Sequence, residues 1–156
     1  MMVDALLALS GSITGNTVTG QATFASSASV LSTNTVDLGI ARDIGQGSDY
    51  AFGRFEVTTA FTGGTSAEFQ IITADDAALT TNVKVIGTTG AIPVASLTVG
   101  ARLVCDINPV IGTKGQRYIG GRTVNVGANS AGSIYADIGA EIQDGQKFYG
   151  SGFAVL

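Results

Sequence analysis

A regular alternation of apolar and polar residues near the end of the chain is the strongest constraint on the fold. The alternate apolar positions are Ile134, Ala136, Ile138, Ala140 and Ile142. The positions opposite them include Tyr135, Asp137 and Glu141. Because successive side chains of a strand point to opposite faces of a sheet, a period of two predicts a β-strand with one buried face.

The same period recurs through the middle of the chain. It places four residues on the core face of a strand at 54–61, namely Phe55, Val57, Thr59 and Phe61. A glycine-containing hairpin turn is predicted at 62–66, followed by a return strand at 67–73 with Phe69 and Ile71 inward. Further strands are predicted at 82–86, with a turn at 87–90, at 101–107 and at 117–126. Pro93 is expected on a sheet edge or in a connection, because proline cannot donate a ladder hydrogen bond.

These segments amount to roughly seven to nine short strands spaced about ten residues apart, which predicts an all-β jelly roll or β-sandwich. No helix of ordinary length is visible in the pattern, so a doubly wound nucleotide-binding sheet is excluded. The 156 residues suit one domain, and 22 glycines with only 13% charged residues favour short strands and turns. We expect a short apolar amino-terminal arm at 1–12 and a single domain at 13–156.

Composition argues against several functions. With 8 basic and 12 acidic residues, the chain lacks the positive charge that binds nucleic acid. It contains no histidine, which removes the commonest general base and transition-metal ligand. Cys105 is the only cysteine and is expected to be a small buried residue of its strand rather than a nucleophile. We therefore predict no enzyme, no cofactor and no metal site.

Two adjacent carboxylates leave other interpretations open. Asp75 or Asp76 is expected to cap one helical turn, although the two carboxylates could instead hold a calcium ion. A hydrolase with paired carboxylates could draw on Asp37, Asp43, Asp75 or Asp76, and is the less favoured hypothesis. A carbohydrate- or receptor-binding sandwich is a further alternative, against which the absence of tryptophan counts.

Apolar residues gather at both ends of the chain. Val3, Leu6 and Leu7 lie in the arm, which is too short to span a bilayer and has no basic flank. Phe148, Tyr149 and Phe153 lie in the closing segment. Each group could pack on its own domain or on a partner, and these six residues are the candidate contacts.

A charged, glycine-containing corner at 32–47 joins a polar extended segment to the first clear strand. Asp37, Arg42 and Asp43 are close enough in sequence to hold a bend by charge-assisted hydrogen bonds. Gly45 and Gly47 supply backbone angles that other residues resist. We expect this corner to be structural.

Four stretches carry a resemblance to a known family: the corner at 32–47, Thr73-Ala-Asp-Asp-Ala-Ala78, the segment that begins Arg117-Tyr-Ile, and Tyr149-Gly-Ser-Gly-Phe153. Together they resemble the capsid cement proteins of short-tailed phages, the family named for the Bordetella podophage. The polar stretch at 14–28 departs from the family pattern.

The resemblance implies a jelly-roll virion protein on the outer surface of an icosahedral head, made in the host cytoplasm. Such a protein cements neighbouring major capsid proteins and forms a homodimer or a trimer. The resemblance implies no membrane or nucleic-acid partner. This role agrees with the residues, because a cement protein needs many repeated contacts and no active site.

Overall fold

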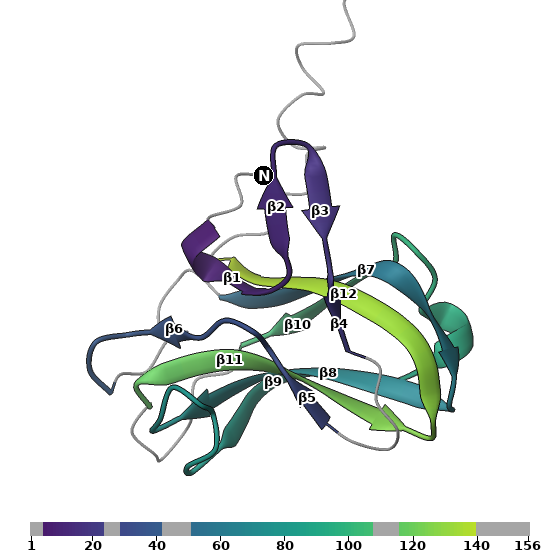
Figure 1. Ribbon diagram of the computed structural model, residues 1–156. Coiled ribbons are helices and arrows are strands. Elements are labelled where there is room, and N and C mark those ends of the chain that lie inside the picture. Colours follow the sequence, from purple (N-terminus) through teal and green to yellow (C-terminus); the bar gives the residue numbers. More distant parts are fainter. Residues whose placement is uncertain (1–4, 24–28, 42–50, 108–115, 140–156) are drawn as a thin grey trace, which may run out of the picture.

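The described residues of the protein form an antiparallel β-sandwich of two five-stranded sheets (Figure 1). The computed structural model describes residues 5–23, 29–41, 51–107 and 116–139. The first sheet contains β1 (Ala8–Ser10), β12 (Asn129–Gly139), β7 (Phe52–Gly63), β10 (Arg102–Asp106) and β4 (Gln21–Ala22). The second contains β5 (Ser29–Leu31), β11 (Tyr118–Val126), β8 (Ser66–Ala74), β9 (Lys84–Pro93) and β6 (Val36–Asp37). The all-β prediction is confirmed.

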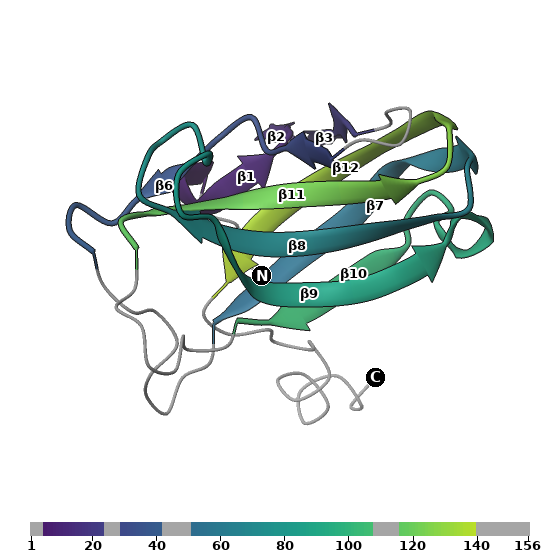
Figure 2. The same cartoon turned by 90° about the horizontal axis from the view of Figure 1, so that it is seen from below.

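Strand order in the two sheets is that of a jelly roll. The first sheet runs β1-β12-β7-β10 and the second β5-β11-β8-β9, and Figure 2 shows the second in front of the first. The pairs nest inside one another along the chain: β8 with β9, β7 with β10, β5 with β11, and β1 with β12. A long double strand rolled over itself gives this nesting, with each sheet receiving alternate pairs.

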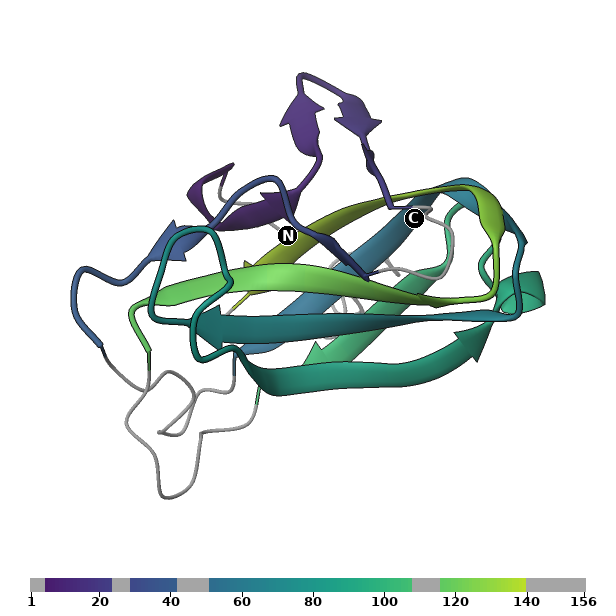
Figure 3. The same ribbon diagram turned by 60° about the horizontal axis from the view of Figure 1, so that its bottom comes forward.

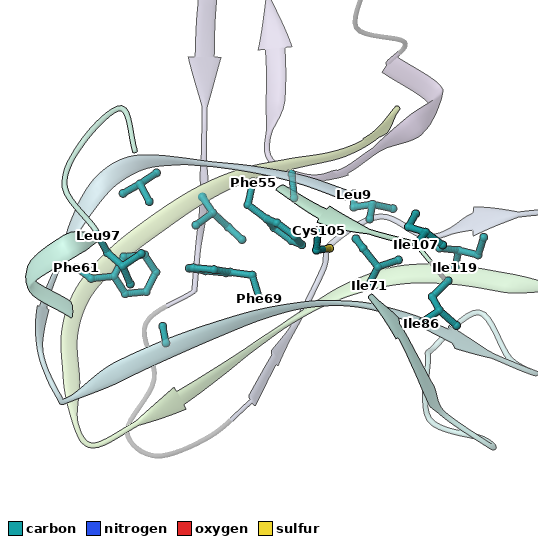
Figure 4. Packing of buried hydrophobic residues seen from close by; sticks show 14 residues of the cluster. Leu9, Phe55, Phe61, Phe69, Ile71, Ile86, Leu97, Cys105, Ile107 and Ile119 are labelled. Carbon is teal, nitrogen blue, oxygen red and sulfur yellow. The ribbon is translucent and has the colours of Figure 1, made fainter. Parts of the chain in front are cut away.

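Three phenylalanines fill the space between the sheets (Figure 4). Phe69 of β8 is fully buried, and its ring lies 5.4 Å from that of Phe55 and 5.8 Å from that of Phe61, both on β7. The Phe61 contact is edge-to-face, an arrangement that aromatic rings prefer. All three were predicted to face inward. Thr59 was predicted to do so as well, but it is exposed. Register shifts between β7 and β12 on both sides of Thr59 interrupt the alternation there, and Phe61 faces inward again.

Two predicted turns have a different role in the structure. Residues 62–66 do not close a hairpin, because β7 and β8 belong to different sheets and the turn crosses between them. Residues 87–90 are not a turn, because β9 continues through them with a register shift against β8. Pro93 ends β9, an outer strand of its sheet, as predicted. Local glycines indicated a bend correctly in the first case, but they cannot say which strand pairs with which.

The connection between β8 and β9 folds back over the outer face of the second sheet. Leu79 is 3% exposed and has a left-handed φ of 58°. It packs with Ile72 and Ala74 in a second apolar cluster. A Cβ at Gly120 would collide with the Leu79 side chain, so the glycine lets this side chain lie close against the sheet.

The amino-terminal segment divides between the core and the surface. η1 (Ala5–Leu7) leads into β1, which pairs with β12. Leu9 has no exposed surface and belongs to the main core, whereas Leu6 is 83% exposed. Residues 8–10 therefore belong to the domain's own sheet.

We predict that Leu9→Ala lowers the free energy of unfolding by about 2–5 kcal/mol, because it leaves a cavity between two packed sheets. Urea denaturation measures this change. Leu6→Ala is the control on the same segment and should change stability by less than about 0.5 kcal/mol. Equal effects of the two substitutions would contradict the assignment of Leu9 to the core.

Candidate functional site

An ion pair joins β6 to the start of β11 at the surface. Arg117 donates from Nε and Nη2 to the two carboxylate oxygens of Asp37, each at 2.7 Å. The N–H of Gly39 donates to the same carboxylate at 2.8 Å. Both charged side chains are close to half exposed, and the guanidinium lies 5.1 Å from the centre of the Tyr118 ring. These donors, Arg117 first, lower the pKa of Asp37 to about 2.

The corner predicted from the sequence is only partly described. Arg42, Asp43, Gly45 and Gly47 lie outside the described residues, and the partner that the structure gives Asp37 is Arg117. Sequence analysis did not find this pair, because 80 residues separate the two side chains. The register of β6 on β11 brings them together, and that register has no local signal in the sequence.

The Asp37–Arg117 pair should make stability depend on pH. Because the pKa of Asp37 is near 2 in the folded state and about 4 in an unfolded chain, its contribution is complete above about pH 4 and lost towards pH 2. We predict that Asp37→Asn lowers Tm at pH 7 and that this difference disappears by about pH 2. Thermal unfolding across that range measures it.

Arg117→Gln is the matched variant for the same pair. It should show the same pH dependence, and the double variant should be no less stable than either single variant, because the two side chains act as one unit. A Tm difference that stays constant from pH 7 to pH 2 would contradict the prediction.

The two predicted turn carboxylates are held within their own loop. Asp76 accepts hydrogen bonds from the N–H groups of Thr80 and Thr81 at 2.9 and 2.7 Å and from the Thr80 hydroxyl at 2.8 Å. These donors, Thr81 first, lower the pKa of Asp76. Asp75 accepts from Asn82 at 2.6 Å and from Gln116 at 3.2 Å. Asp76 thus fixes the loop that carries Leu79. This loop forms a turn, and not the helical turn that the sequence predicted.

Metal ligands do not cluster in the part of the chain that the structure describes: no group of three or more His, Cys, Asp or Glu side chains could hold an ion there. Cys105 is buried, as expected, and burial raises the pKa of its thiol to about 11. A thiol with this pKa is protonated at neutral pH and is a poor nucleophile.

A buried ion pair lies on the face of β12 that the alternation left polar. Arg54 of β7 donates from Nε to Asp137 at 3.0 Å and forms a second, shorter hydrogen bond to the same carboxylate. The Asp137 side chain is 7% exposed and Tyr135 is 2% exposed. Burial, together with the nearby Asp137 charge, raises the pKa of Tyr135 to about 12. The sequence predicted a strand with one buried face, but both faces are buried here.

A polar network covers part of the outer face of the second sheet. Arg122 donates to Gln70 at 2.8 Å, and Gln70 donates to Glu68 at 2.6 Å. Thr88 donates to the same Glu68 oxygen, also at 2.6 Å. These bonds, Thr88 first, lower the pKa of Glu68. The network links β11, β8 and β9 and is a cross-strand brace.

The candidate contact residues are described only in part. Leu6 is the most exposed of the large apolar side chains in the described residues, and Leu7 is partly buried. Val3, Phe148, Tyr149 and Phe153 lie outside the described residues. Sequence analysis missed other exposed apolar side chains, among them Ile13 and Val18, which lie on a short hairpin of β2 (Ser12–Thr14) and β3 (Thr17–Thr19).

Fold and surface together define an antiparallel jelly-roll domain whose described charged side chains mostly brace its own strands and loops. Residues 17–138, most of the chain, match the Bbp16 family. The chain therefore belongs to the Bbp16 family, a phage protein family whose name refers to a Bordetella phage. No curated protein matches the chain. None of the helices in the described residues is long and apolar enough to cross a membrane.

Proposed function

We propose that this protein is a structural component of a phage virion that binds the outer face of an icosahedral head and cements neighbouring major capsid proteins. The observation that carries the proposal is the match of most of a jelly-roll chain to a phage protein family. The protein acts by binding, with no catalytic step. It works as a homo-oligomer on the capsid surface, with the major capsid protein as its partner.

Geometry supports this role through rigidity. A cement protein resists separation of its neighbours only if its own domain does not deform, and two sheets joined by a packed aromatic core meet that requirement. Individual contacts can be weak, because many copies act on the same shell and several contacts must break together.

Leu6 is the described side chain best placed to make one of these contacts. It is 83% exposed, and it lies three residues before Leu9, which is anchored in the core. An apolar side chain that projects from an anchored segment loses little conformational freedom on binding and gains burial.

The copy number of the chain in purified virions tests the proposal. Quantitative mass spectrometry should find a fixed number of copies of this chain per copy of the major capsid protein. We expect that ratio to be one or to differ from one by a small whole-number factor, because each contact site on the shell repeats with the symmetry of the shell. A handful of copies per virion would overturn the cement role. That result would favour the alternative, a carbohydrate- or receptor-binding sandwich of the virion.

We predict that Leu6→Asp weakens binding to capsids that lack the protein by about tenfold or more, because a charge replaces a buried apolar contact. Co-sedimentation with such capsids measures the binding. Val99→Asp is the matched control, since Val99 is 67% exposed and lies beyond η2 (Val94–Ser96), elsewhere on the domain. Equal binding by both variants would remove Leu6 from the contact surface while leaving the copy-number test intact.

A further inference from the structure

The β2–β3 hairpin projects from the sandwich as an excursion from one edge of the first sheet (Figure 3). The chain pairs with β12 through β1, leaves the sheet at Gly11, and pairs with β12 again through β4. The eight residues between, 12–19, are all exposed. In the described part of the chain, β2 and β3 pair only with each other.

Glycines fix the base and the tip of this hairpin. Gly11 has a φ of 78°, and a Cβ there would collide with the carbonyl oxygen of Thr19. At the tip, Gly15 has a φ of 59°, which suits the first position of a two-residue hairpin turn. The projection is therefore a defined structural element, although a lone two-stranded ribbon is only marginally stable in water.

Register determines which backbone groups the hairpin offers to a partner. Thr14 lies opposite Thr17 next to the turn, and Ile13 lies opposite Val18. In a hairpin with a two-residue turn the pair flanking the turn is hydrogen-bonded, so the next pair directs its N–H and C=O groups outward. Ile13 and Val18 thus present the free backbone groups of the two edges.

The same two residues form an exposed apolar pair. Ile13 is 41% exposed and Val18 is 39% exposed. Natural proteins protect exposed strand edges with charged residues or proline. Residues 5–36 contain no charged residue and no proline, so neither edge has this protection.

The absence of charge on the hairpin permits pairing with a second copy. When a strand pairs with its own copy across a two-fold axis, each residue near the axis meets an identical one, and a charged residue would repel itself. The chain has a net charge of −4, yet the hairpin has none. It can therefore meet a second copy without repulsion.

We propose that the β2–β3 hairpin pairs edge to edge with the same hairpin of a second copy, antiparallel across a two-fold axis. Either Ile13 lies opposite Ile13 of the copy or Val18 lies opposite Val18. The result is a four-stranded ribbon with one continuous apolar face, in which the free backbone groups are hydrogen-bonded.

This inference deepens the homo-oligomer part of the proposed function. Strands of three residues bury far less than the roughly 1,200 Å² of a stable dimer interface, so the pairing is weak between free molecules. Copies held side by side on a shell raise the effective concentration and make the pairing persistent.

Disulfide trapping in the purified chain detects such a weak pairing. Two single variants, Ile13→Cys and Val18→Cys, are compared with Val99→Cys, an exposed control away from the hairpin. Cys105 can remain because it is buried, and the unsubstituted chain reports any background from it. Opposed residues of a hydrogen-bonded antiparallel pair have Cα atoms about 5.5 Å apart, which a disulfide can bridge.

Under mild oxidation we expect at least one hairpin variant to form covalent dimers about tenfold faster than Val99→Cys, with the faster variant identifying the paired edge. Equal rates for all three variants would overturn the inference. The assay contains no capsid protein, so its failure would leave the virion copy number unaffected, and a low copy number would leave the trapping result unaffected.

Discussion

Nested pairing of strands that are distant in the sequence is the constraint on which the rest of the structure depends. Ala8 faces Asp137 across β1 and β12, while β8 and β9 pair near the middle of the chain. Each outer pair spans a longer stretch of chain than the one inside it, so its closure costs more entropy unless the inner pairs form first. The phenylalanine cluster between the sheets offsets part of that cost, because the turn at 62–66 brings β7 and β8 together directly. We therefore expect the chain to fold slowly for its length, as sandwiches dominated by non-local contacts do.

Most of the described charged side chains stabilise the pairing of strands or the conformation of a loop. Arg54 and Asp137 join β7 to β12, Asp37 joins β6 to β11, and Asp76 fixes the loop over the second sheet. A buried ion pair adds little net stability, but removal of one partner strands a charge, so it disfavours any other register of these strands. Exposed large apolar side chains on the described surface include Leu6 and, on the β2–β3 hairpin, Ile13 and Val18.

Sequence alone predicted the strand pattern, the inward phenylalanines and the fold class, because each depends on a local period of two. It could not predict the turn at 62–66 as a crossing between sheets, since a tight turn with glycine suits either a hairpin or a crossing. It also missed the Asp37–Arg117 pair and the contact of Arg54 with the Tyr135 ring, because the two partners of each contact lie about 80 residues apart in the sequence. Of the candidate contact residues, Leu6 stood out as apolar in the sequence, but only the structure separates it from the buried Leu9.

The short pairing of β1 with β12 has a mechanical consequence. Only two Cα pairs define its register, Ala8 with Asp137 and Ser10 with Ala136, and a shift lies between them. A force that pulls outward on the amino-terminal segment loads these few hydrogen bonds one after another, as in peeling, and not all at once. The amino-terminal segment would therefore detach before the long β7–β12 ladder separates. The central strands of the sandwich would stay paired while this segment extended.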